Sequence, residues 1–140
     1  MPFFHKPETA SADYLSGVAF FEGFSADDLK RVAALSSQLE VEAGSVIIDQ
    51  GDAGLECFVI VDGDVSVYVA SEHIATLQAG SMVGEMALVD HRPRSASVVA
   101  DTRVKLLRFD APHFKKLLEE MPRASERVMN LLTARMQRHA

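Results

Sequence analysis

Residues 84–98 read GEMALVDHRPRSASV and place a carboxylate, Glu85, and a guanidinium, Arg94, in a stretch that is mostly small or apolar. An unpaired charge in such surroundings is unfavourable, because its desolvation costs several kcal/mol. Each group therefore needs a partner. The two could pair with each other in a salt bridge that steadies a loop, or both could face a ligand.

The residues around this pair could build an anion site. Residues 85–88 follow Gly84 and could form one helical turn, whose first backbone N–H groups would be open to an anion. The next turn brings Arg94 back toward this helix start, and a guanidinium with several amides is what a phosphate diester requires. Glu85 would then accept hydrogen bonds from hydroxyl groups. Arg92 is the rival guanidinium, but a proline separates it from Arg94, and we expect it to be solvated.

Composition indicates a single globular domain that would not bind polyanions over its whole surface. The 140 residues, 48% of them hydrophobic, are enough for one core. The formal net charge of −6 repels nucleic acid and anionic membranes, so an anionic ligand would need a local positive pocket. Cys57 lies in the apolar run CFVIV and is expected in the core. The N-terminal residues lack the apolar segment of a signal peptide, and no apolar run approaches the roughly 18 residues of a membrane helix, so we expect a cytoplasmic protein without membrane insertion.

The elements that must position the pair change type along the chain. Residues 1–12 are expected to form a flexible arm, and residues 13–140 a single domain. Within that domain, Ser25-Ala26-Asp27-Asp28 is a capping box that begins a helix. Two further helices are expected within about 111–139, with Pro122 as a break between them.

Short β-type runs alternate with turn signals from about residue 39 to residue 109. Val65, Val67 and Val69 alternate with polar or aromatic residues, which is typical of a half-buried strand. Asp62-Gly63 separates two such runs and predicts a hairpin. The fold class expected is therefore mainly β: a jelly-roll-like antiparallel barrel (a double-stranded β-helix) with an N-terminal helical segment and two C-terminal helices.

The cassette VGEMAL…RSASV is accompanied upstream by FFEGFSADDL, EAGSVIIDQGDAG and CFVIVDGDVSVY. Together these motifs resemble the cyclic nucleotide-binding domains of the catabolite activator protein, protein kinase A regulatory subunits and cyclic nucleotide-gated channels. The family's phosphate-binding cassette runs apolar-Gly-Glu-apolar-Ala-Leu, then a variable turn, then Arg-small-Ala-small-Val. The resemblance covers roughly residues 18–122.

The resemblance implies ligand-binding roles for nine residues of the cassette: Val83, Gly84, Glu85, Met86, Ala87, Arg94, Ser95, Ala96 and Val98. Arg94 would pair with the cyclic phosphate, and Glu85 would accept a hydrogen bond from the ribose 2′-OH. The backbone amides of Ala87 and Ser95 would also bind the phosphate, to which the Ser95 hydroxyl could add a bond.

The remaining cassette residues would shape the pocket. Gly84 would allow close approach to the ribose, while Val83, Met86 and Val98 would pack around the sugar and base. The ligand implied is cAMP, with cGMP as the alternative. An arginine followed by serine is compatible with cAMP, yet a hydroxyl at that position can also meet the guanine amino group of a syn cGMP. No other cofactor and no metal are expected.

The C-terminal helix carries an apolar stripe at Val128, Leu132 and Met136, which is most simply core but could also pair with a second copy. In the family this region often supplies a lid over the base or a dimer helix, and Arg135 and Gln137 could reach a base from here. We therefore expect a soluble stand-alone sensor that signals to an unidentified protein partner through its C-terminal helices, and that could form a homodimer through the last one.

Other function classes find little support in the residues. The five histidines form no H-x-H or H-x3-H pair, as a cupin-type metal enzyme would need, and no serine has a G-x-S-x-G context. We therefore expect no enzyme activity. The family's transcription factors carry a helix-turn-helix after their C-terminal helix; this sequence shows no such motif and its net charge is negative, so no direct DNA binding is expected. Two alternatives stay open: a structural or interaction module that keeps the fold without the ligand, and the sensor domain of a longer channel or regulator.

Overall fold

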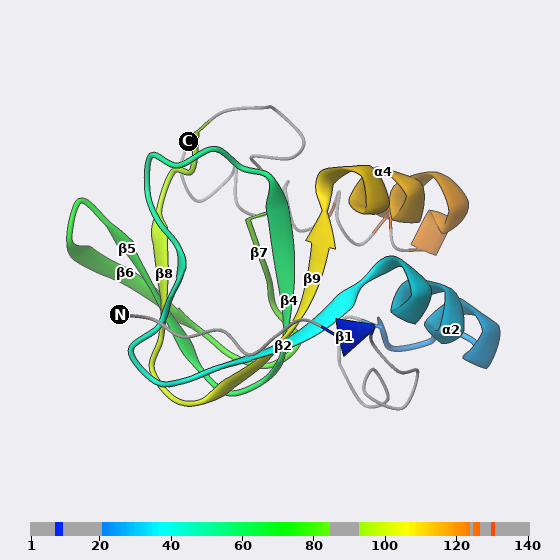
Figure 1. The fold of residues 1–140 in the computed structure, drawn as a ribbon, viewed down its shortest axis with the longest axis horizontal. Helices are drawn as coiled ribbons and strands as arrows, with labels where there is room; N and C mark the ends of the chain where they lie inside the picture. Colours follow the sequence, from blue (N-terminus) through cyan, green and yellow to red (C-terminus); the bar gives the residue numbers. More distant parts are fainter. Residues whose placement is uncertain (1–7, 10–20, 85–92, 124, 127–129, 131–140) are drawn as a thin grey trace.

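The computed structural model describes residues 8–9, 21–84, 93–123, 125–126 and 130. In this part of the chain two antiparallel sheets lie face to face, and two helices cover the outer face of one of them (Figure 1). This arrangement confirms the predicted fold class, an antiparallel β-roll with flanking helices.

The larger sheet has five described strands, and every neighbouring pair in it is antiparallel. Its order is β1 (Glu8–Thr9), β2 (Ser37–Val41), β9 (Val104–Asp110), β4 (Glu56–Asp62) and β7 (Met82–Val83). The smaller sheet runs β3 (Val46–Ile48), β8 (Ser97–Ala100), β5 (Val65–Val69) and β6 (Glu72–Leu77). Strands that follow each other in the chain thus often lie in different sheets, as a jelly roll requires.

Two hydrophobic cores share strands β4 and β9. Phe58 and Ile60 of β4 face the inner core between the two sheets, while Cys57 and Val59 face the outer core beneath the helices. The alternation follows from the pleat, which directs successive side chains to opposite faces. Because β4 is covered on both faces, its sequence reads as a continuous apolar run, and Cys57 is fully buried as expected.

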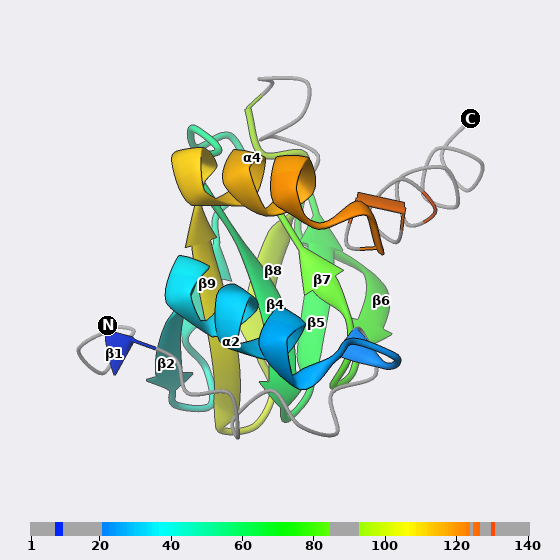
Figure 2. The same ribbon diagram turned by 90° about the vertical axis from the view of Figure 1, so that its right-hand side faces the viewer.

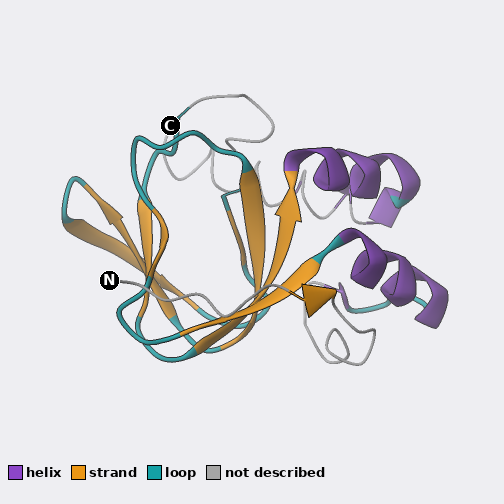
Figure 3. Ribbon diagram, viewed as in Figure 1, coloured by secondary structure: helices purple, strands orange, loops and turns teal. Residues whose placement is uncertain are grey.

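The two helices lie side by side over β4, β7 and β9 (Figures 2 and 3). Helix α2 (Ala26–Leu35) begins at the predicted capping box, in which Ser25 and Asp28 exchange side-chain-to-backbone hydrogen bonds. Helix α4 (Ala111–Glu120) begins at Asp110 and ends before Pro122. Arg31 of α2 donates two hydrogen bonds, of 2.6 and 2.9 Å, to the carboxylate of Glu120 at the end of α4.

The hairpin predicted at Asp62-Gly63 is wrong. Strands β4 and β5 on either side of it lie in different sheets, so this turn crosses from one sheet to the other. Gly63 has a φ of +99° and sits so close to the turn before β9 that an added Cβ would lie 2.5 Å from the Arg103 carbonyl oxygen. A turn signal marks a change of direction, but it does not show which strands will pair. The hairpin that does form joins β5 to β6 through Ala70 and Ser71.

The two ends of the chain, predicted as an N-terminal arm and a last helix, are described only in part. Glu8–Thr9 forms β1 and pairs with β2, while the other residues of the flexible arm predicted over 1–12 lie outside the described residues, so that prediction stays a prediction. Pro122, Arg123, Ser125, Glu126 and Asn130 are helical. The rest of the last predicted helix, with its apolar stripe and the proposed lid residues Arg135 and Gln137, lies outside the described residues.

Candidate functional site

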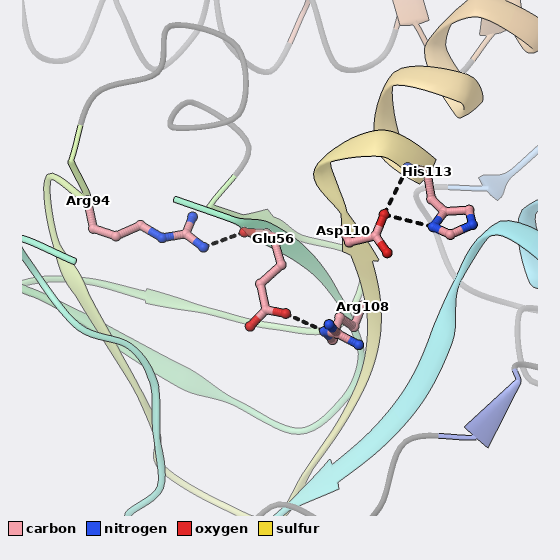
Figure 4. Close-up of polar contacts among 5 residues, drawn as sticks. All are labelled: Glu56, Arg94, Arg108, Asp110 and His113. Atoms are coloured by element: carbon pink, nitrogen blue, oxygen red, sulfur yellow. Dashed lines mark hydrogen bonds and ion pairs between the residues drawn. The ribbon is translucent and has the colours of Figure 1, made fainter. Parts of the chain in front are cut away.

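Arg94 is a buried charge whose guanidinium points at backbone oxygen atoms. Only 8% of the residue is exposed. Its Nη1 donates a hydrogen bond of 2.7 Å to the carbonyl oxygen of Gly84, and its Nη2 donates to the carbonyl oxygen of Glu56 (Figure 4). Gly84 follows β7 and Glu56 opens β4, so the guanidinium lies against the ends of two paired strands. Two acceptors on one planar group fix its orientation.

Gly84 admits the guanidinium because it has no side chain. Its φ is +84°, and a Cβ built there would lie 2.5 Å from Arg94 Nη1 and 3.0 Å from Ile48 Cδ1. The first contact is shorter than any real Cβ makes, so a larger residue would displace the arginine. The sequence predicted close approach at this glycine but assigned it to a ribose; the approach that the structure describes is that of Arg94.

The backbone of Arg94 is held by the loop that precedes β4. Arg94 N donates to Asp52 O at 2.8 Å, and Gly51 N donates to Arg94 O at 2.9 Å. The strand that follows Arg94, β8, does not begin until Ser97. The physical reason is that Arg94 pairs with this loop and not with a strand of the sheet. Gly51 and Asp52 were not among the predicted site residues.

The same loop is anchored to strand β8 and to the turn between β5 and β6. Gln50 N donates to the Ser97 hydroxyl at 2.9 Å, and the Gln50 side-chain oxygen accepts from Ala70 N at 2.9 Å. Ala70 and Ser71 have φ angles of 50° and 68°, which L-residues seldom adopt. Gln50 therefore connects the strained tip of the β5–β6 hairpin to the loop that carries the Arg94 backbone.

Glu56 contacts two arginines through different atoms. Its carbonyl oxygen accepts from Arg94, while its carboxylate accepts from Nε of Arg108 on β9 (Figure 4). The side chains of Glu56 and Arg108 are each 33% exposed. The preceding carbonyl, that of Leu55, accepts from Ala111 N at the start of α4 at 3.1 Å. Sequence reasoning missed Glu56 and Arg108, because only the register of β4 against β9 brings them together.

Asp110 is the last residue of β9 and the N-cap residue of α4. Its carboxylate accepts from His113 N at 2.9 Å and lies 2.7 Å from His113 Nδ1 (Figure 4). Partial burial acts to raise the pKa of Asp110, but the hydrogen bonds from His113 and the positive charges of His113 and Arg108 outweigh it. The pKa of this carboxyl is therefore lower than its ordinary value.

The predicted cassette residues are placed only in part. Val83 and Val98 are buried in the inner core, on strands β7 and β8. Ser95 is exposed and Ala96 is half-buried. Four other residues lie outside the described residues, so the structure does not test their contacts: Glu85, Met86, Ala87 and Arg92. In particular, the choice between a Glu85–Arg94 salt bridge and a ligand stays a prediction.

Within the described ranges, no group of three or more His, Cys, Asp or Glu side chains is arranged to hold a metal ion. No helix in this part of the chain is long and apolar enough to cross a bilayer.

Known proteins share both the sequence pattern and the fold. The family model of the cyclic nucleotide-binding domain matches residues 38–121, more than half of the chain. A cAMP-dependent protein kinase regulatory subunit from Schizosaccharomyces pombe is 38% identical over 90 residues, which are 64% of this chain and 22% of that protein. A cyclic nucleotide-gated potassium channel from Rhizobium etli is 42% identical over 88 residues, which are 63% of this chain and 24% of the channel.

A solved structure gives the same result at the level of the fold. The catabolite activator protein of Thermus thermophilus matches with a TM-score of 0.78 and 25% identity, over 86% of this chain and 59% of that one. The chain therefore spans about a quarter of the length of the two relatives and less than two thirds of the solved protein.

Proposed function

The chain belongs to the cyclic nucleotide-binding domain family, and on that premise we propose that it is a regulatory module that binds cAMP at Arg94. The observation that carries the proposal is the buried guanidinium of Arg94, oriented by the carbonyl oxygens of Gly84 and Glu56. A guanidinium held in place matches the planar oxygens of a phosphate with little loss of side-chain freedom on binding. The domain is a binding unit, and nothing in the proposal requires a catalytic group.

The ligand favoured is cAMP, with cGMP as the alternative. The relative from Schizosaccharomyces pombe is named for its dependence on cAMP, which supports this choice. Ser95 follows Arg94 directly and is exposed, so its hydroxyl is open to a ligand. That hydroxyl is compatible with cAMP and is also the group through which a syn cGMP could be selected.

The other cassette residues take the roles that the family pattern gives them. Glu85 would accept from the ribose 2′-OH, so a 2′-deoxy nucleotide should bind more weakly than its parent. The amides of Ala87 and Ser95 would add hydrogen bonds to the phosphate. Equal affinity for the 2′-deoxy ligand would contradict the role of Glu85.

Three apolar residues would pack around the sugar and base: Val83, Met86 and Val98. Val83 and Val98 are already packed in the inner core: Val83 ends β7 just before Gly84, and Val98 lies near the start of β8, which follows Arg94. A ligand seated on Arg94 would therefore meet an ordered apolar floor.

We also propose that the signal leaves through the C-terminal helices to a protein partner, with a homodimer through the last helix as one form. Two consecutive carbonyls support this route. Glu56 O accepts from Arg94, and Leu55 O accepts from the first residue of α4. A ligand bound at Arg94 would shift α4 between two positions, and the shift in that equilibrium can be no larger than the difference in the ligand's affinity for the two positions. Unchanged amide exchange in residues 111–140 on saturation would overturn this route.

Calorimetric titration with cAMP and with cGMP, in parallel, tests the binding proposal. Micromolar or tighter binding of either nucleotide is expected, and at 100 times Kd the ligand should add about 2.7 kcal/mol to the stability. Removing one partner of a buried charge contact costs about 2–5 kcal/mol, so Arg94→Ala should weaken binding by roughly 30-fold to several thousand-fold. The matched control is Arg103→Ala, which removes an exposed arginine paired with Glu40. No heat and no stabilisation from either nucleotide would overturn the proposal.

One observation favours a second candidate, a structural or interaction module that does not bind the ligand. The guanidinium of Arg94 already donates to two carbonyls of its own chain, which would satisfy a purely structural arginine. The same titration separates the two candidates. In either case we propose that residues 13–140 form one domain, because the two cores share strands β4 and β9, and that this domain could serve as the sensor of a longer channel or regulator.

A further inference from the structure

Glu56 is the residue through which Arg94 is connected to the rest of the larger sheet. Its carbonyl oxygen accepts from Arg94 and its carboxylate accepts from Arg108. It is also the first residue of β4, and its pairing with Asp110 is the last pair of the β4–β9 ladder. Beyond that pair, the hydrogen bond from Ala111 N to the Leu55 carbonyl oxygen is the contact with the start of α4, and the end of a strand is held less tightly than its middle.

The ion pair with Arg108 counteracts that freedom. Glu56 of β4 is paired with Asp110 of β9, and Arg108 lies two residues before Asp110 on β9. The side chains of Glu56 and Arg108 therefore meet diagonally across the two strands. Both are one third exposed, which leaves the pair only partly screened by water. Because the carboxylate is held by β9, the ion pair restrains the residue whose carbonyl oxygen accepts from Arg94.

We propose that the Glu56–Arg108 ion pair is a positioning device for nucleotide binding: it fixes the Glu56 carbonyl, and the carbonyl fixes the guanidinium of Arg94. The inference rests on the proposed function, since it assigns these two residues a role in that same site. Neither residue needs to touch the ligand. The geometry makes Glu56 a positioning residue that acts through Arg94, and Arg108 a positioning residue that acts through Glu56.

An argument from net charge and the positioning role predict opposite effects of Glu56→Gln on nucleotide affinity. A carboxylate near an anionic phosphate repels it, so Glu56→Gln should tighten binding if only the net charge matters. If the carboxylate positions Arg94, the same substitution should weaken binding. A cross-strand pair can account for about a fivefold loss of affinity. Arg108→Gln should weaken binding on either view, so the sign for Glu56 decides between them.

The experiment measures the cAMP affinity of the whole chain and of four variants, well below the unfolding temperature of the least stable one. Glu56→Gln, Arg108→Gln and the double variant are each expected to bind about fivefold more weakly than the wild type, without further loss in the double variant, because both substitutions break the same pair. The matched control is Glu40→Gln, which removes the carboxylate of β2 that pairs with Arg103, in the turn before β9, and with Lys105 of β9. Its affinity should equal that of the wild type.

A second measurement separates this inference from the proposed function. In the nucleotide-free protein, the Nε–H resonance of Arg94 reports how firmly the guanidinium is held. It should exchange faster with water in Glu56→Gln than in the wild type and be unchanged in Glu40→Gln. Tight binding by the wild type with unchanged affinity in Glu56→Gln and Arg108→Gln overturns the positioning role alone. Absence of binding in the wild type overturns the proposed function. If, in addition, the Arg94 Nε–H exchanges with water at the same rate in Glu56→Gln as in the wild type, the positioning role is overturned as well.

Discussion

Substitution of Gly84 by alanine tests the packing of the site most directly. The backbone there has a φ of +84°, and the left-handed region costs an L-residue about 1–2 kcal/mol. The new Cβ would also lie 2.5 Å from Arg94 Nη1, so the guanidinium must move and lose its hydrogen bond to the Gly84 carbonyl. A hydrogen bond from a charged group contributes about 1.5–3 kcal/mol. The two effects together should lower the free energy of unfolding by about 2.5–5 kcal/mol.

Gly44 provides a control with the same backbone and no close neighbour. Its φ is +89°, and nothing lies within 4 Å of a Cβ built on it. Gly44→Ala should therefore cost only the backbone strain of about 1–2 kcal/mol. The difference between the two variants isolates the displacement of Arg94 from the strain that any alanine would suffer at positive φ.

Urea unfolding of both variants, with calorimetric titration of cAMP, measures the two consequences. We expect Gly84→Ala to lose clearly more stability than Gly44→Ala and at least about tenfold in affinity, while Gly44→Ala binds as tightly as the wild type. Equal losses of stability in the two variants, with full affinity in Gly84→Ala, would refute the argument that this glycine exists to seat the arginine.

Three further predictions concern the groups around the site. Because the folded-state pKa of Asp110 is lowered, its contribution to stability is complete above the unfolded-state pKa of about 3.9 and is lost as pH falls through the lower folded-state value. The stability difference between wild type and Asp110→Asn should shrink accordingly in acid unfolding titrations, and a difference that does not change with pH would contradict it. Gln50→Ala should cost about 0.5–1.5 kcal/mol and speed amide exchange at Ala70; an Ala70 amide that exchanges as before would rule out this anchor. Arg31→Gln should lower stability slightly at low salt and not at high salt, because its pair with Glu120 is exposed; a large or salt-independent loss would show that the pair does more than join two helix surfaces.

Local features of the chain could be predicted from residue types alone. The capping box at Ser25 forms because its hydrogen bonds span three residues. The break before Pro122 likewise needs no distant partner, since proline cannot continue a helix. The alternating apolar residues gave the strands and the β-roll class, because the pleat turns a two-residue period into a buried face.

Pairing between strands was less accessible. Asp62-Gly63 has the composition of a hairpin turn but connects two sheets, since the same left-handed glycine serves any sharp change of direction. The Glu56–Arg108 contact depends on the register of β4 against β9, across 52 residues of chain. No local pattern encodes that register.

The sequence by itself determined that a charged arginine among small and apolar residues must find a partner, and it identified Arg94 and Gly84 as site residues, with the close approach at Gly84 assigned to a ribose. Only the tertiary structure decided that the partners include the carbonyl oxygens of Gly84 and Glu56, the latter 38 residues away. The physical reason is that every residue carries the same carbonyl group. The chemistry of a side chain can be read from the sequence, whereas the fold alone decides which backbone carbonyl points toward a given donor.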